Sequence, residues 1–186
     1  MSRITIAAIA FACVTSPSLV LAQPVPGGID ANPVSAAIRQ SWAVAKRDIQ
    51  ESAAQMPDAD FMFKPVDTVR SFGAILAHVA GASYEFCAAA KGQKPPHTED
   101  EFEKSATTKM AITKAVTDAI TYCDTAYSSL TDKTAAEIVD GAFGGGKAAR
   151  ASALIGNTTH YMEHYGNLVT YFRIKGMVPP SSRPRK

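Results

Sequence analysis

Four long segments with helical apolar periodicity constrain the fold of this chain more than any other feature. They span about residues 33–54, 72–91, 105–130 and 147–175. Within the first segment, apolar residues recur at steps of three and four, the spacing of one helix face, as at Ile38, Trp42, Ala45 and Ile49. Alanine is abundant and β-branched alternation is scarce, which favours helices. The pattern therefore predicts an all-α four-helix bundle.

Residues typical of helix ends stand at the breaks between these segments. Asn32 is expected to cap the first helix, with Pro33 in its first turn, and Ser71 is expected to cap the second. Gly92 and Gly176 are expected to end the second and fourth helices. The core candidates of the third helix are Met110, Ala111, Val116, Ile120, Tyr127 and Leu130.

Residues 1–22 have the pattern of a cleaved secretory signal peptide. Arg3 precedes an apolar run at residues 4–14, and the small residues Val20 and Ala22 stand before Gln23. The apolar run is shorter than the roughly 20 residues of a membrane span. Lipidation at Cys13 is an alternative, although the three residues before it match a lipidation signal poorly. We therefore expect a periplasmic or extracellular protein with no stable membrane anchor after cleavage.

The mature chain is expected to form one domain. Residues 23–32 are predicted to be disordered, residues 33–180 to form the bundle, and residues 181–186 to be a basic tail. Cleavage removes Arg3 from the 19 basic residues and leaves the 17 acidic ones, which gives a net charge of +1. This balance gives no indication of a nucleic-acid partner.

A polar linker at residues 93–104 bears on the topology. A dozen extended residues span about 40 Å, enough to run the height of a bundle. Such a crossover makes the second and third helices parallel and predicts an up-down-down-up arrangement.

The cysteines agree with a crossover. Cys87 lies 16 residues after Ser71, and Cys123 lies 18 residues after Ser105. At 1.5 Å per residue, both would lie about 24–27 Å along parallel helices. An exported chain meets an oxidising compartment, so we predict a Cys87–Cys123 disulfide; two buried reduced cysteines are the alternative.

Three of the four histidines are candidate metal ligands. His160 and His164 are four residues apart, so they share one face of the fourth helix. His78 lies early in the second helix, which is antiparallel to the fourth in this topology, and can supply a third nitrogen. A three-histidine site with an open position is typical of reactive metal centres, and His₃ suits zinc, nickel, copper or iron. A buried, hydrogen-bonded core histidine is the alternative role for His78.

Four segments of the sequence resemble the DinB-like (DinB/YfiT) family. They are FMFKP at residues 61–65, VRSFGAILAHVA at 69–80, HYMEHYGNL at 160–168 and RIKGMVPPS at 173–181. The resemblance covers roughly residues 32–182. It implies an up-down-down-up four-helix bundle and a divalent metal held by His78, His160 and His164. Members are often homodimers, and relatives include thiol-dependent transferases and isomerases.

These observations predict a metal-dependent enzyme with an unidentified small-molecule substrate. Zinc or nickel is the preferred cation, and the reaction is expected to be a hydrolysis or the transfer of a small group. Thiol-dependent relatives work in the cytoplasm, where small thiols are abundant. This chain is expected to be exported, so we do not expect a thiol cosubstrate, whereas metal-assisted hydrolysis is compatible with export. The alternative is a non-catalytic metal-binding or structural bundle.

Other motifs are given structural roles. Glu163 points about 100° away from His164 around the helix, so we expect it to be exposed or to face a dimer partner. His97 in the linker is expected to be exposed. Tyr161 and Tyr165 flank the ligands and can line a pocket. The spacing of a phosphate-binding loop at residues 141–147 lacks the hydroxyl that would follow Lys147, so these glycines are expected to form a flexible loop.

Overall fold

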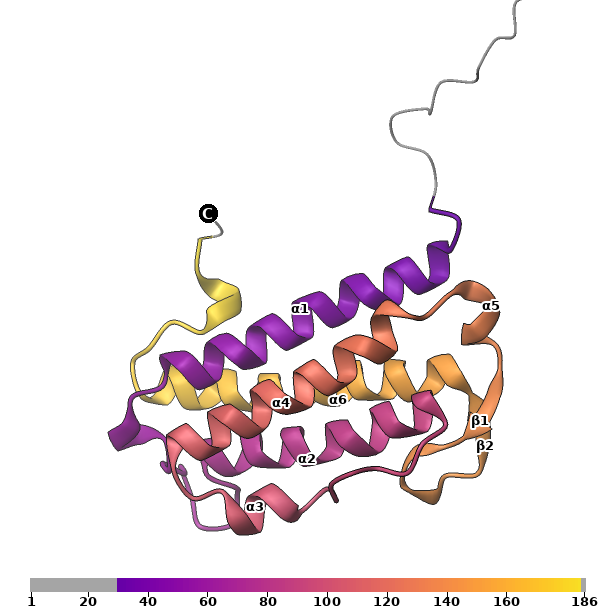
Figure 1. Ribbon diagram of the computed structural model, residues 1–186. Helices are drawn as coiled ribbons and strands as arrows, with labels where there is room; N and C mark the ends of the chain where they lie inside the picture. Colours follow the sequence, from indigo (N-terminus) through magenta and orange to yellow (C-terminus); the bar gives the residue numbers. More distant parts are fainter. Residues whose placement is uncertain (1–29, 185–186) are drawn as a thin grey trace, which may run out of the picture.

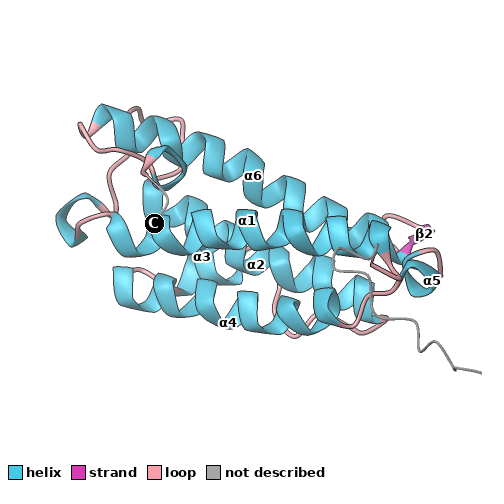
Figure 2. Cartoon of the chain, turned by 90° about the horizontal axis from the view of Figure 1, so that it is seen from above, coloured by secondary structure: helices cyan, strands magenta, loops and turns pink. Residues whose placement is uncertain are grey.

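The computed structural model describes residues 30–184, so the signal-peptide pattern and most of the predicted disordered segment lie outside the described residues. Four long helices run alongside one another (Figures 1 and 2): α1 (Pro33–Gln55), α2 (Phe72–Lys91), α4 (Lys109–Ser128) and α6 (Arg150–Ile174). The short helices are η1 (Asp58–Asp60), α3 (Glu101–Ser105), α5 (Asp132–Ala135), η2 (Ala142–Gly144) and η3 (Pro180–Ser182). Two short strands, β1 (Ile138–Asp140) and β2 (Lys147–Ala149), form an antiparallel hairpin.

Contacts between helix ends confirm the up-down-down-up topology. Lys109, which begins α4, donates to the carbonyl of Ala54 near the end of α1, so these two helices are antiparallel. The side chain of Gln55, which ends α1, donates to the carbonyl of Val178 just beyond α6, so α1 and α6 are parallel. The most extensive contacts of α2 are with α4 and α6.

The structure contains the predicted disulfide between α2 and α4. Cys87 is the sixteenth residue of α2 and Cys123 the fifteenth of α4, with their Cα atoms 5.3 Å apart. Both helices have 20 residues, so residues this far from the two helix starts lie side by side only when the helices run in the same direction. Both cysteines are fully buried, so the bond is part of the core.

The crossover from α2 to α4 lies directly against α2. In Figure 1 it runs back along α2 before reaching α3. A Cβ atom on Gly81 would lie 2.0 Å from the carbonyl oxygen of Glu99, so only glycine permits this approach. The crossover contains the short helix α3, which the sequence did not predict. The next long helix, α4, begins at Lys109 and not at Ser105 as expected. Thr108 causes that later start, since its side chain accepts from the amide of Ala111 and caps α4.

Aromatic side chains fill the centre of the bundle. The ring of Trp42 stacks on Tyr127 at 4.5 Å and contacts Tyr161 edge-on at 4.8 Å, which joins α1, α4 and α6. Four of the core residues predicted for the third helix are buried: Val116, Ile120, Tyr127 and Leu130. Met110 was wrongly placed there: it is 82% exposed, because the face of α4 that meets the bundle begins at Ile112.

The expected helix ends are correct for α2 but not for α1. Ser71 accepts from the amide of Ala74, and Gly92 ends α2 in the left-handed conformation with φ of 67°. Asn32 does not cap α1, since its side chain accepts from the amide of Asp132. Asp132 in α5 caps α1 instead, because its carboxylate accepts from the amides of Val34 and Ser35 at 3.2 and 2.7 Å.

The glycine-rich segment before α6 is a hairpin and not the flexible loop expected from the sequence. Strands β1 and β2 pair Ile138 with Ala149 and Asp140 with Lys147. Lys147 therefore lies in a strand, and α6 begins three residues later than predicted, at Arg150. The amide of Arg150 donates to the carbonyl of Glu137 at 2.7 Å, which anchors the start of α6 to the hairpin.

The chain after α6 folds back onto the bundle. The hydroxyl of Tyr165 donates to Ser181 Oγ at 2.8 Å and accepts from the Ser181 amide at 2.8 Å. Ser181 and Ser182 lie in η3, so the first residues of the predicted tail belong to the folded domain. The Pro-Pro-Ser end of the segment at residues 173–181 therefore has a structural role, because Ser181 holds the chain after α6 against that helix.

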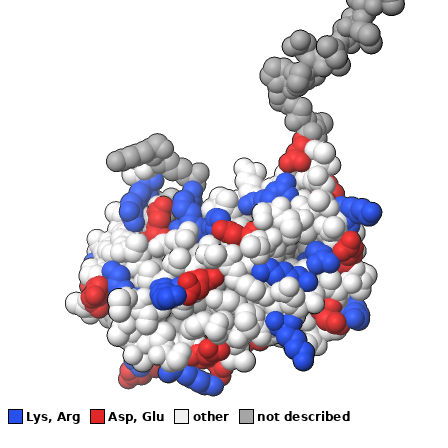
Figure 3. All heavy atoms as spheres, viewed as in Figure 1, with Lys and Arg blue, Asp and Glu red and all other residues white. Residues whose placement is uncertain are grey.

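Surface charge is mixed on the face shown in Figure 3, where basic and acidic side chains are interspersed. Ion pairs among the described residues include Lys46–Asp124 and Lys114–Asp118. Among the described residues, only α2 is long and apolar enough to cross a membrane, and most of it is buried among the other helices.

Candidate metal centre

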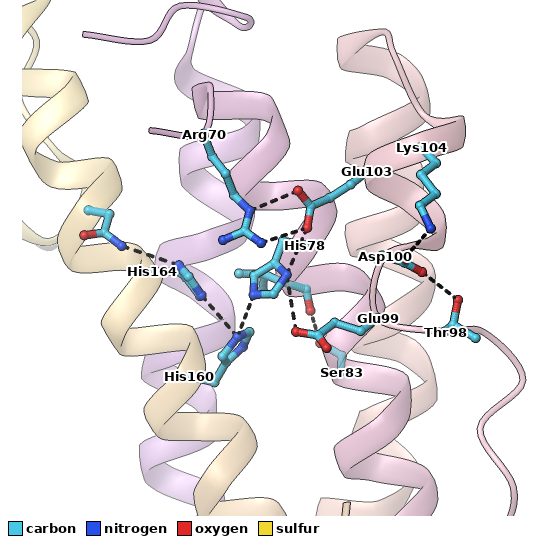
Figure 4. Close-up of polar contacts among 12 residues, drawn as sticks. Arg70, His78, Ser83, Thr98, Glu99, Asp100, Glu103, Lys104, His160 and His164 are labelled. Carbon is cyan, nitrogen blue, oxygen red and sulfur yellow. Dashed lines mark hydrogen bonds and ion pairs between the residues drawn. The ribbon is translucent and has the colours of Figure 1, made fainter. Parts of the chain in front are cut away.

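The three predicted histidines meet between α2 and α6. His78 projects from α2, and His160 and His164 project from successive turns of α6 (Figure 4). The Nε2 atom of His160 lies 3.1 Å from Nε2 of His78 and 3.1 Å from Nε2 of His164. The hydroxyls of Ser83 and Tyr161 are hydrogen-bonded at 2.9 Å, which fixes α2 against α6 immediately behind the histidines. The sequence therefore predicted a cluster that the fold assembles.

The arrangement of these nitrogens fits a divalent cation. A neutral imidazole Nε2 carries either one hydrogen or one lone pair, so His160 Nε2 can hydrogen-bond to only one of its two close neighbours. A cation among the three nitrogens would use all three lone pairs. Two nitrogens bound at 2.0–2.1 Å to a tetrahedral ion lie about 3.3 Å apart, close to the observed separations. Among the described residues, these three histidines form the cluster with the spacing of a metal site.

Burial favours the neutral form of two of the histidines. His164 is 8% exposed and His160 is half-buried. Burial, followed by the nearby rings of His164 and His78, lowers the pKa of His160 from 6.5 to about 3. Burial also lowers the pKa of His164, with a further contribution from His78. Imidazole binds metals in its neutral form, so the lowered pKa values favour the form of both rings that binds a cation.

The lowered pKa of His160 predicts a pH dependence of the metal-free protein. Because its pKa is lower in the folded state than the unfolded value of 6.5, protonation favours unfolding. The contribution is complete above pH 6.5 and is lost as the pH falls from 6.5 towards 3. We expect the Tm of metal-free protein to fall between pH 7 and 5, and to fall less in H160Q. Thermal unfolding at both pH values checks this, and equal slopes in the two proteins would contradict it.

Carboxylates from the crossover lie behind His78. The Oε1 atom of Glu103 is 3.0 Å from His78 Nδ1, and Oε1 of Glu99 is 3.6 Å away. The angle at Nδ1 is outside that of a regular hydrogen bond, so the contact with Glu103 is chiefly electrostatic. It favours a hydrogen on Nδ1, which leaves the Nε2 lone pair for a metal. Arg70 holds Glu103 in place through two contacts, at 2.9 and 3.2 Å (Figure 4).

We expect E103Q to lower metal affinity by about 10–100-fold, the usual cost of losing a carboxylate partner of a metal-bound histidine. The substitution removes the negative charge that orients His78 but leaves all three histidines in place. Competition with a chromophoric chelator measures the affinity. E101Q is a matched control, because Glu101 lies on the same helix and contacts His97 at 2.9 Å instead of the cluster. An equal loss in both variants would contradict a specific role for Glu103.

Asn167 is the neighbour of His164 on the other side of the cluster. Its amide nitrogen is placed 3.4 Å from His164 Nδ1. The oxygen and nitrogen of an amide have nearly the same shape, and a metal-binding Nε2 requires a hydrogen on Nδ1. Asn167 accepts that hydrogen when its oxygen faces the ring.

A cleft of 610 Å³ opens beside the cluster. Its wall includes His164, so a small molecule in the cleft reaches the edge of the candidate metal centre. The volume lies within the usual range of small-molecule sites. The other lining residues are Pro65, Thr68, Val69, Arg70, Ile75, Asn167, Thr170 and Tyr171.

The remaining residues singled out in the sequence lie elsewhere. Glu163 is exposed, as expected. His97 is half-buried instead of exposed, because it packs on Tyr84 and Phe102. Tyr161 and Tyr165 are buried in the bundle and do not line the cleft.

The sequence did not identify the roles of Arg70, Glu99, Glu103 and Asn167. Arg70 lies in a family-like segment and Asn167 in another, but neither stood out as a ligand. Glu99 and Glu103 belong to a polar linker whose path across α2 is visible only in the structure.

Comparison with solved structures supports the fold. A DinB-like protein from Bacillus cereus ATCC 10987 is 20% identical with a TM-score of 0.65, and the match covers 78% of this chain and 95% of that one. A DinB-like protein from Bacillus subtilis is also 20% identical, with a TM-score of 0.61 and coverage of 81% and 99%. The mycothiol-dependent maleylpyruvate isomerase is 14% identical with a TM-score of 0.59, covering 72% of this chain and 60% of the isomerase.

Two sequence comparisons were informative in different ways. No curated protein matches the chain in sequence, whereas a family model does. The DinB superfamily model matches residues 42–168, which hold all three clustered histidines and both cysteines of the disulfide. The chain therefore belongs to the DinB superfamily.

Proposed function

We propose that this protein is a metal-dependent enzyme that hydrolyses, or transfers a small group from, a small molecule bound in the cleft. The observation that carries the proposal is the convergence of three Nε2 atoms beside that cleft, whose wall includes His164. A divalent cation, with zinc or nickel preferred, would supply Lewis acidity there and lower the pKa of a water from about 15.7 towards 7.

The protein's own residues would hold and orient the reacting groups. His78, His160 and His164 would bind the cation through Nε2, and Glu103 and Asn167 would fix the orientation of two of the rings. The four-helix scaffold keeps these side chains on rigid elements, which favours a site that is already formed before substrate binds. Thr170 and Tyr171 also line the cleft and would contact the substrate.

We also propose that the chain is exported, which bears on the reaction. The pattern at residues 1–22 and the disulfide between Cys87 and Cys123 support export, since disulfides persist in oxidising compartments. One structural neighbour is a mycothiol-dependent isomerase. A cytoplasmic thiol is not expected outside the cell, so we favour hydrolysis over thiol-dependent chemistry for this chain.

The test uses protein loaded with zinc, nickel or cobalt and a panel of small esters, amides and lactones. We expect hydrolysis by metal-loaded wild type and by H97A, and none by H160A or by metal-free protein. In the cobalt-loaded protein, azide should change the visible absorption spectrum, because a coordination position is open. A spectrum that azide leaves unchanged, together with no hydrolysis, would instead indicate the non-catalytic metal-binding alternative.

A further inference from the structure

The side chain of Arg70 contacts a carboxylate next to the histidine cluster and also lines the cleft. Its Nε and Nη2 atoms contact Glu103, while the residue also lines the cleft beside His164. Figure 4 shows the third guanidinium nitrogen, Nη1, directed away from Glu103 and towards the His164 side. Among residues 30–184, Nη1 has no hydrogen-bond partner, whereas Nε and Nη2 both donate to Glu103. Arg70 therefore presents a hydrogen-bond donor with positive charge to a ligand in the cleft.

The position of Arg70 is fixed by its backbone. The hydroxyl of Tyr171 on α6 donates to the carbonyl of Arg70 at 2.5 Å. Ser71, the next residue, caps α2. The backbone of Arg70 is thus tied to the two helices that carry the histidines, and its guanidinium is held by Glu103.

The charges around the cluster define the ligand that fits. A divalent cation and Arg70 contribute three positive charges, while Glu99 and Glu103 contribute two negative charges. Glu163 is exposed and does not line the cleft, but its negative charge reaches His164 and further disfavours a dianion there. With neutral histidine ligands, the cation, Arg70, Glu99 and Glu103 together carry one positive charge. This matches a monoanion better than a phosphate, which carries about −1.5 to −2 at neutral pH.

The rest of the cleft is mostly apolar. Pro65, Val69 and Ile75 line it, and Val66 is exposed on the same loop. A ligand with an apolar body would bury this surface while its charged end faces Arg70 and the metal.

On these grounds, and resting on the proposed function, we propose that the substrate class is a small monocarboxylate with an apolar body. Its carboxylate lies between Arg70 Nη1 and the open side of the three histidines, and its apolar part lies along Pro65, Val69 and Ile75. Arg70 acts here as a binding residue that selects and orients the substrate.

Calorimetry on cobalt-loaded protein tests this proposal with hexanoate, its neutral analogue hexanamide and inorganic phosphate. We expect hexanoate to bind wild type at least about tenfold more tightly than hexanamide does, and R70Q to weaken hexanoate binding by about tenfold. R70K, which keeps the charge, should restore most of this loss. R39Q is a matched control, because Arg39 also pairs with a carboxylate but lies on α1 outside the cleft.

Metal content is measured in each variant, so that loss of the cation is distinguished from loss of the anion site. Equal hexanoate binding by wild type and R70Q, both with metal bound, would overturn this inference and leave the proposed function intact. Tighter binding of phosphate than of hexanoate would overturn the monoanion class. A wild-type protein that retains no cation would overturn both proposals together.

Discussion

Replacing His160 with alanine should abolish stoichiometric metal binding. His160 Nε2 is 3.1 Å from both other Nε2 atoms, so it is the central ligand of the cluster. Loss of a supporting partner already costs about 10–100-fold in affinity, and loss of a ligand should cost more than about a hundredfold. Elemental analysis after dialysis against metal-free buffer measures the effect directly.

H97A is the matched control for this experiment. His97 is the one remaining histidine of the chain, and it contacts Glu101, Tyr84 and Phe102 away from the cluster. Its replacement should leave metal content unchanged. A cation retained by H160A at the wild-type level, or lost from H97A, would show that the metal is bound elsewhere.

Removing the disulfide should produce the largest change in stability. The bond joins residues 36 apart in sequence, and a loop of this length is worth about 3–4 kcal/mol through restriction of the unfolded chain. We expect the double variant C87A/C123A to lose about that much free energy of unfolding. Urea unfolding of wild type and variant, both without reductant, gives the comparison.

Two further measurements separate the bond from the packing of its sulfur atoms. Both cysteines are fully buried, so a reductant should act slowly on folded wild type and rapidly once urea unfolds it. Wild type that is reduced while unfolded and then refolded should match the double variant to within about 1 kcal/mol, since only small packing differences remain. An unfolding free energy of the double variant equal to that of oxidised wild type would contradict a stabilising role for the bond.

The architecture could be predicted because its determinants repeat along the chain. Apolar spacing located all four long helices, and the bounds of α2 were correct because Ser71 and Gly92 act within its own sequence. Equal heights of Cys87 and Cys123 distinguished parallel from antiparallel pairing of two helices. Each of these signals depends on local sequence or on simple helix geometry.

Features that depend on distant residues could not be predicted in this way. The cap of α1 comes from Asp132, which is 97 residues away from Ser35. The hairpin before α6 depends on the pairing of β1 with β2, whereas the glycines between these strands give the sequence a pattern typical of a loop. The exposure of Met110 follows from the rotation of α4 about its axis. The predicted start of this helix was four residues too early, so the sequence did not predict that rotation.

The candidate site likewise combines residues that local sequence predicts with residues that only the folded chain brings together. The His-x-x-x-His spacing of α6 predicted two ligands, and the topology placed His78 beside them. The supporting carboxylates could not be predicted, because Glu99 and Glu103 reach His78 only through the close approach of the crossover at Gly81. The cleft is likewise formed by α6 and a loop about a hundred residues earlier in the chain.

An anomalous-scattering map of crystals grown with zinc or nickel tests the central claim most directly. The account predicts one strong peak bound to the Nε2 atoms of His78, His160 and His164, at about 2.0–2.1 Å from each. It also predicts at least one coordination position that faces the cleft and has no protein ligand. No peak among these nitrogens in metal-saturated crystals, or a peak whose coordination is closed by a fourth protein ligand, would contradict the account.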